Sequence, residues 1–219
     1  IGYLKPWQAT FMIVGIPGLI LALAAFFLKE PKRIEEQVNF DLGSDNKNIF
    51  VHLKEHKNAL IPMFGGLIFM ALIFYSFSFW APTMMIRAFD ISLSEVGLIL
   101  GVITIISSII GTILAGTAVD YLRNKNYSDA PVRAAMIAVM LALPPIVSLS
   151  FINSEIGAWV CIALYLLFIS SFAPLGLLAI SGVSTGNVKG QAAAIHAFLM
   201  MAFGLSLGPQ LTAFFTDFI

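Results

Sequence analysis

Within the long uncharged stretches of this chain, His196 is the one acidic, basic or imidazole side chain that lies well inside a stretch. An unperturbed imidazole has a pKa of about 6.5, so it can bind or release a proton at physiological pH. Ionisable groups inside a membrane span face a cavity or a partner more often than lipid. Two interpretations therefore stay open: a cavity residue that handles substrate or protons, and a packed, hydrogen-bonded histidine near the cytoplasmic end of its helix.

The other polar side chains in these stretches are neutral, and none forms a catalytic pattern. Segments 182–186 and 204–208 match G-x-S-x-G, but a nucleophile elbow needs a preceding strand and then an acid and a histidine in order. No acid lies between the first serine and His196, and no histidine follows the second. H-E-x-x-H and the Walker A pattern are absent, and the single Cys161 speaks against a metal site. We predict no enzyme, no cofactor and no metal. The polar residues are Tyr75, Ser76, Ser78, Trp80, Thr104, Ser107, Ser108, Tyr165, Ser170, Ser171, Gln191, His196 and Gln210.

The elements that must position these side chains are six stretches without Asp, Glu, Lys or Arg. Each is long enough for a helix to cross a hydrocarbon layer about 30 Å thick, which takes about 20 residues. Apolar residues make up 59% of the chain and charged residues 11%, and the mean hydropathy is +0.93. These values are typical of a membrane protein, and the net charge of zero gives no sign of a nucleic-acid partner. The runs are apolar on all sides, which favours helices over a β-barrel. The stretches are residues 6–28, 58–86, 96–119, 134–154, 156–188 and 190–216.

The basic residues are distributed unequally over the gaps between these stretches. If alternate gaps lie on alternate sides of the membrane, ten basic residues fall on one side and only Lys5 and Arg87 on the other. By the positive-inside rule, the ten-charge side is cytoplasmic and both ends of this chain lie outside. We expect a multi-pass protein of the plasma (inner) membrane.

The longest gap, residues 29–57, divides the chain into one span and five. Glu30-Pro31 should end the first helix, because proline disfavours helical geometry in the residue before it. Residues 48–57 place apolar side chains at helical spacing and predict a short helix on the cytoplasmic surface; an ordinary solvated connector fits as well. We therefore predict a transmembrane helix at 1–28, a cytoplasmic loop at 29–57 and a helical bundle at 58–219.

Helix breakers and small residues recur in the spans. Prolines at 17, 62, 144, 145, 174 and 209, several beside glycine, predict kinked helices of the kind that gate transporters. Small residues stand four apart at 97 and 101, 111 and 115, 193 and 197, and 204 and 208, a spacing that lets helices approach closely. The short external connections predict that spans two and three, and spans four and five, are antiparallel neighbours.

The end of the third span resembles the G-x-x-x-D-R/K-x-G-x-R/K loop of the major facilitator superfamily. Gly116, Asp120 and Lys125 match, whereas Tyr121 replaces a basic residue and Arg123 replaces the second glycine. The resemblance implies a conformational loop, and an acid at a helix C-terminus needs a cationic or helix-N-terminal partner, which Arg123 or Lys125 could supply.

Further segments are similar to the Spinster-like branch of this superfamily, and the resemblance covers nearly the whole chain. These segments are residues 7–18 with 29–31, 80–82, 93–97, and 189–194 through 208–209 and 216–217. The resemblance implies helices six to eleven of a twelve-helix transporter, with the first five helices and the last one missing. The expected fold is an all-α, polytopic membrane bundle of six transmembrane helices, mainly the C-terminal half of a major facilitator fold.

The resemblance also implies alternating access, in which two bundles rock about a central site. Its partners would be the lipid bilayer, a small organic or amphipathic, lipid-like solute, and the missing N-terminal half. A transporter-like receptor or scaffold without flux is the alternative, and an intramembrane enzyme ranks third because we find no paired catalytic groups. The implied cavity residues lie in spans two, three, five and six: Tyr75, Ser78, Trp80, Thr104, Ser107, Tyr165, Gln191 and His196.

Overall fold

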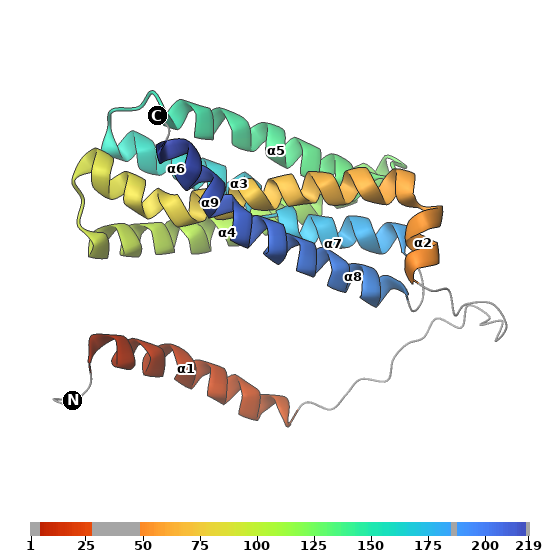
Figure 1. Cartoon of the computed structure of the whole chain (residues 1–219), viewed down its shortest axis with the longest axis horizontal. Helices are drawn as coiled ribbons and strands as arrows, with labels where there is room; N and C mark the ends of the chain where they lie inside the picture. The colour runs from red at the N-terminus through yellow and green to blue at the C-terminus, as the bar shows by residue number, and fades with distance from the viewer. Residues whose placement is uncertain (1–4, 28–48, 185–187, 218–219) are drawn as a thin grey trace. The chain divides into compact units, whose positions relative to one another are not determined.

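A computed structural model describes residues 5–27, 49–184 and 188–217 of the chain, and within these ranges every regular element is a helix (Figure 1). This confirms the expected all-α fold. The helices are α1 (Pro6–Ala25), α2 (Ile49–Glu55), α3 (Lys57–Phe89), α4 (Leu93–Asn124), α5 (Ala130–Leu149), α6 (Glu155–Ile169), α7 (Phe172–Val183), α8 (Val188–Leu199), the π-helix η1 (Met200–Leu205) and α9 (Ser206–Asp217).

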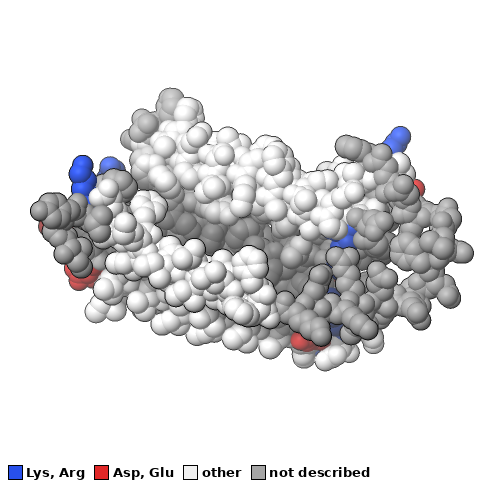
Figure 2. All heavy atoms as spheres, turned by 90° about the horizontal axis from the view of Figure 1, so that it is seen from below, with Lys and Arg blue, Asp and Glu red and all other residues white. Residues whose placement is uncertain are grey.

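Six segments of the described chain are long and apolar enough to cross a membrane, as predicted. Charged side chains lie at the ends of these segments, and on the face shown in Figure 2 the stretch between the coloured charged residues is white. Helices satisfy their own backbone polar groups, so such segments can sit in lipid without water. The six spans are Gln8–Ala25, Lys57–Phe89, Leu93–Asn124, Ala130–Leu149, Glu155–Val183 and Val188–Thr216.

The chain divides into two compact units, residues 1–42 and 43–219. In the first unit, α1 carries strongly exposed apolar side chains such as Phe11 and Leu21, more than 70% accessible. The predicted helix end at Glu30-Pro31 lies outside the described residues, as does most of the predicted loop.

The short helix predicted at 48–57 exists as α2 in the second unit. Its Ile49 and Leu53 pack against the core of the bundle, and the helix contacts α3 and α8. The side chain of Phe50 lies outside the described part. α2 therefore rests its apolar face on the bundle, against α3 and α8.

Two helix pairs organise the second unit. α4 runs parallel to α6, since Ser107 contacts Ala163 and Gly111 contacts Leu167. α3 likewise runs parallel to the span 188–217, and α5 covers α6 and α7. Parallel packing of spans two and six, and of spans three and five, requires each pair to enter from the same side, as alternating spans must.

Short turns join the neighbouring antiparallel spans, as the connection lengths predicted. Asp90 ends α3 in the left-handed region with a φ of 55°, and Ser92 caps α4 by accepting a hydrogen bond from the Glu95 amide. Ser154 caps α6 in the same way, with the Gly157 amide as donor.

Only some of the proline positions interrupt a helix. Pro17, Pro62 and the pair at 144–145 lie inside unbroken α-helices. Interruptions occur instead before Pro174, where α6 ends at Ile169 and α7 begins at Phe172, and before Pro209, where η1 intervenes.

Likewise, only some of the predicted glycine positions contact another helix. Gly204 and Gly208 contact α3 closely and Gly111 contacts α6, whereas a Cβ on Gly97 or Gly101 would meet no described atom within 4 Å. The predicted close approach is confirmed for Gly111, Gly204 and Gly208.

Candidate functional site

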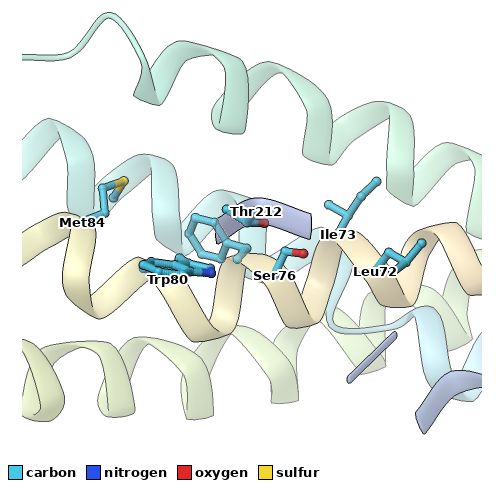
Figure 3. Close-up of a pocket in the computed structure, with 8 residues that line it drawn as sticks. Leu72, Ile73, Ser76, Trp80, Met84 and Thr212 are labelled. Carbon is cyan, nitrogen blue, oxygen red and sulfur yellow. The ribbon is translucent and has the colours of Figure 1, made fainter. Parts of the chain in front are cut away.

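A groove of about 380 Å³ lies between the C-terminal half of α3 and α9 (Figure 3). Its α3 side is a stripe of residues spaced by about four positions, which places them on one helix face. The lining is mostly apolar and the groove is open on one side. Such a surface suits the apolar part of an organic molecule. The lining residues are Leu72, Ile73, Ser76, Phe77, Trp80, Ala81, Met84 and Thr212.

Most polar side chains in this groove form hydrogen bonds to backbone carbonyl oxygens. The Trp80 Nε1–H donates to the Pro209 carbonyl oxygen at 3.0 Å, and the Thr212 hydroxyl donates to the Gly208 carbonyl oxygen at 3.3 Å. The Ser76 hydroxyl makes no hydrogen bond within the described chain and is the groove's available polar group.

The three predicted cavity residues of α3 do not share one face. Trp80 lines the groove, whereas Tyr75 is half-buried against Gly204 and Ser78 is exposed. Two positions along a helix turn about 200°, so Ser78 points away from the face that carries Ser76 and Trp80.

Three other predicted residues bond helix backbones. Thr104 donates to the Leu100 carbonyl oxygen of its own helix at 2.7 Å, and buried Ser107 donates across to the Ala163 carbonyl oxygen at 3.2 Å. The hydroxyl of buried Tyr165 approaches the Ile73 carbonyl oxygen at 3.4 Å. Its ring packs on Phe77, with 4.5 Å between centroids, and so lies behind the groove wall.

The last two predicted cavity residues lie on α8, away from the groove. Gln191 is exposed near the start of the helix, and His196 is 5% exposed. A Cβ on Gly176 would lie 3.0 Å from Cε1 of His196 and 2.8 Å from a methyl of Leu67, so the imidazole packs between α3 and α7. Its Nδ1 is buried without a hydrogen-bond partner in the described chain. The geometry matches the packed interpretation except for this unbonded nitrogen.

The loop residues that resemble the family pattern lie at the end of α4. Gly116 has open space where a Cβ would be, and Asp120 and Arg123 are exposed. The Lys125 ammonium lies 4.6 Å from the centre of the Tyr121 ring, and this side chain raises the pKa of Lys125 above its usual value. No ion pair joins Asp120 to Arg123 or Lys125 in the described chain.

A second charged group lies at the start of α5, where the loop from α4 ends. Arg133 donates from Nε to the Asp129 carboxylate at 2.7 Å and lies over the Tyr127 ring. This hydrogen bond holds the pKa of Asp129 below its usual value. Within the described residues no three His, Cys, Asp or Glu side chains gather as a metal site would require.

The sequence analysis named Ser76 as a polar residue but not as a cavity residue, and it missed Thr212 and the Pro209 carbonyl as a hydrogen-bond acceptor. The spacing of Leu72, Ser76, Trp80 and Met84 by four would have revealed one stripe of α3. The pairing of that stripe with α9 is tertiary, and no local pattern in the sequence indicates it.

A family model described as Major Facilitator Superfamily matches residues 1–209. No curated protein and no solved structure matches the chain significantly.

Proposed function

The chain belongs to the major facilitator superfamily, and on that premise we propose that this membrane transporter moves a small organic or amphipathic, lipid-like solute by alternating access. The supporting observation is that several polar side chains within the spans bond to the protein's own backbone. Trp80, Thr104, Ser107 and Tyr165 all reach backbone carbonyl oxygens, and no charged residue lies in the middle of a described span. These helices therefore offer a solute apolar contact and few polar groups.

The groove beside Trp80 is the surface we propose for the apolar part of the solute. Its volume lies at the lower end of the range for small-molecule sites, about 300 to 1,000 Å³. An apolar chain there would gain about 25 cal/mol for each Å² removed from water. The other predicted cavity residues remain candidates for contacts in other conformations of the cycle.

The wider organisation is part of the same proposal. We place the protein in the Spinster-like branch, with α1 as helix six, residues 29–57 as the cytoplasmic loop between halves, and 58–219 as helices seven to eleven. An N-terminal half would complete the solute path. We also propose that the protein lies in the plasma (inner) membrane. The basic-residue distribution supports an orientation with both ends of this chain outside. The Gly116 to Lys125 loop would change partners during the cycle, and no catalytic role is proposed.

A matched pair of cysteine variants tests where the solute binds. Ser76→Cys lies in the groove and Ser78→Cys on the opposite face at nearly the same depth, both in a Cys161→Ala background. With the whole transporter in vesicles, an amphipathic solute should slow maleimide labelling at position 76 and leave labelling at 78 unchanged.

The same vesicles test the function itself. Gradient-dependent flux of amphipathic solutes, and not of sugars or amino acids, is the expected result. If flux occurs and the solute protects only position 78 from labelling, the solute binds on the opposite face of α3. Flux of highly charged solutes alone would overturn the proposed solute class, and binding without flux would favour a receptor.

A further inference from the structure

The span of residues 188–217 is weakened at two neighbouring points. In η1 the backbone leaves α geometry, and the Ser206 N–H donates to the Met201 carbonyl oxygen, five residues back. Pro209 has no N–H, so it cannot donate to the carbonyl of Leu205 as an α-helical residue would. π segments are rare and are frequent at functional sites. Residues 200–209 are therefore where this span bends at least cost.

The weak region packs closely on α3, because Gly204 and Gly208 present no side chain of their own at this contact. A Cβ on Gly204 would lie 2.6 Å from Cβ of Ala71, and one on Gly208 would lie 2.8 Å from the Leu72 carbonyl oxygen. η1 and α9 pack extensively against α3, whereas α8 contacts it much less. Bending at 200–209 would thus change how α9 sits on α3.

Trp80 adds a directional bond to this contact. Its Nε1 donates to the carbonyl oxygen of Pro209, a residue of the weak region, across 129 positions of sequence. Breaking this bond leaves the Pro209 carbonyl oxygen without its side-chain donor, and a typical hydrogen bond contributes about 1 kcal/mol, or about fivefold in an equilibrium constant. The indole ring also lines the groove between the two helices. The ring therefore contributes packing at this contact, and the N–H contributes a hydrogen bond.

We propose that residues 200–209 are a hinge and that Trp80 is a positioning residue that latches it. With the bond made, α9 is held against α3; with the bond broken, α9 can tilt about η1 and Pro209. The latch then sets how much of the transporter occupies the conformation described here. This inference is independent of the solute proposed above.

Two variants separate the latch from the hinge. Trp80→Phe keeps an aromatic ring in the groove and removes the donor. Pro209→Ala keeps the carbonyl acceptor and gives the helix back the missing N–H. Trp159→Phe is the matched control, because its Nε1 donates to Glu155 within one helix at 3.3 Å.

The measurement is the distance between spin labels at Arg87→Cys and Thr216→Cys, at the outer ends of α3 and α9, in the whole transporter lacking Cys161. Trp80→Phe should broaden this distribution and shift a two-state population about fivefold, the effect of losing one hydrogen bond. Pro209→Ala should narrow the distribution, and in the double variant it should oppose the broadening. Labels at Leu93→Cys and Phe151→Cys, on α4 and after α5, should report no change.

Three results would overturn the proposal. A Trp80→Phe distribution equal to that of wild type and Trp159→Phe would remove the latch. An unchanged distribution in Pro209→Ala would remove the hinge. Equal broadening at the 93 and 151 labels would show that Trp80→Phe merely loosens the bundle.

Discussion

The fifth and sixth described spans are both interrupted near their middle, but in different surroundings. The α6–α7 interruption is deeply packed: Ser171, Phe172 and Leu175 are at most 4% exposed, and the Ser171 hydroxyl bonds the Phe168 carbonyl oxygen. The interruption at η1 keeps a helical path, and Met201 and Phe203 within η1 are exposed. One break is fixed by its neighbours on several sides, and the other rests mainly on α3.

This difference suggests that a helix break in this bundle is rigid or deformable according to what packs on it. Proline follows both breaks, so proline alone does not separate them. Gly111 of α4 packs on the Leu167 carbonyl oxygen beside the first break, where the helix has begun to lose its own hydrogen bonds. We infer a fixed elbow at 170–171 and a hinge at 200–209.

We expect the largest loss of stability from Gly111→Ala, which introduces a clash at the elbow between α6 and α7. The added Cβ would collide with the Leu167 carbonyl oxygen and lie 2.9 Å from Oγ of Ser170. Because backbone must move, we expect a loss of about 3 kcal/mol of stability, at the upper end for overpacking. Thermal unfolding of detergent-solubilised protein measures it.

Gly97→Ala on the same helix is the control for that prediction. Its Cβ would meet nothing within 4 Å, and alanine favours a helix over glycine by about 0.5–1 kcal/mol. Equal unfolding temperatures for the two variants would show that α4 does not hold the elbow.

Gly208→Ala should have a smaller effect, because the hinge can yield. Its Cβ would lie 2.8 Å from the Leu72 carbonyl oxygen and 3.0 Å from Oγ of Ser76. Tilting of α9 relieves this contact, so we expect about 1 kcal/mol of destabilisation and a shift in the Arg87 to Thr216 label distance. A loss as large as that of Gly111→Ala, with no change in distance, would make the second break as rigid as the first.

Ser107→Ala should cost less again. It removes the bond to Ala163 that ties α4 to α6 above the elbow, and bonds between membrane helices average about 0.6 kcal/mol. Thr104→Ala is the matched change, since its bond stays within α4. Comparing the two unfolding temperatures isolates the bond between helices, and a larger effect at 104 would contradict this assignment.

The sequence predicted the spans well because each depends on local composition. Charge-free length predicted all six spans, and the short connections predicted the turns that Ser92 and Ser154 are found to cap. Glycine spacing predicted contacts at 204 and 208 but also at 97 and 101, where none is found. The spacing of glycines predicts which face of a helix another helix could approach. Whether a helix does approach that face depends on the tertiary arrangement.

The candidate site was predicted only in part for the same reason. Trp80 was named because the family resemblance implies that the second span lines the cavity, but its acceptor, the Pro209 carbonyl, lies 129 residues away. Tyr75, Ser78 and Trp80 were all predicted to face the cavity from the second span, and helical rotation separates Ser78 from Trp80. A polar residue in a span can bond a neighbouring backbone as readily as a solute, as Ser107 and Tyr165 do.

The smallest expected effect lies in the α4–α5 loop, remote in sequence from the elbow and the hinge. Arg133 lowers the pKa of Asp129, so the pair contributes above the unfolded Asp pKa of about 3.9 and is lost as pH falls through the lower folded value. Both side chains are nearly half exposed, and water screens such pairs. Asp129→Asn should therefore leave the unfolding temperature and the 87 to 216 label distance unchanged between pH 5 and 8. If that distance shifts, the loop is coupled to the hinge and the two breaks do not act separately.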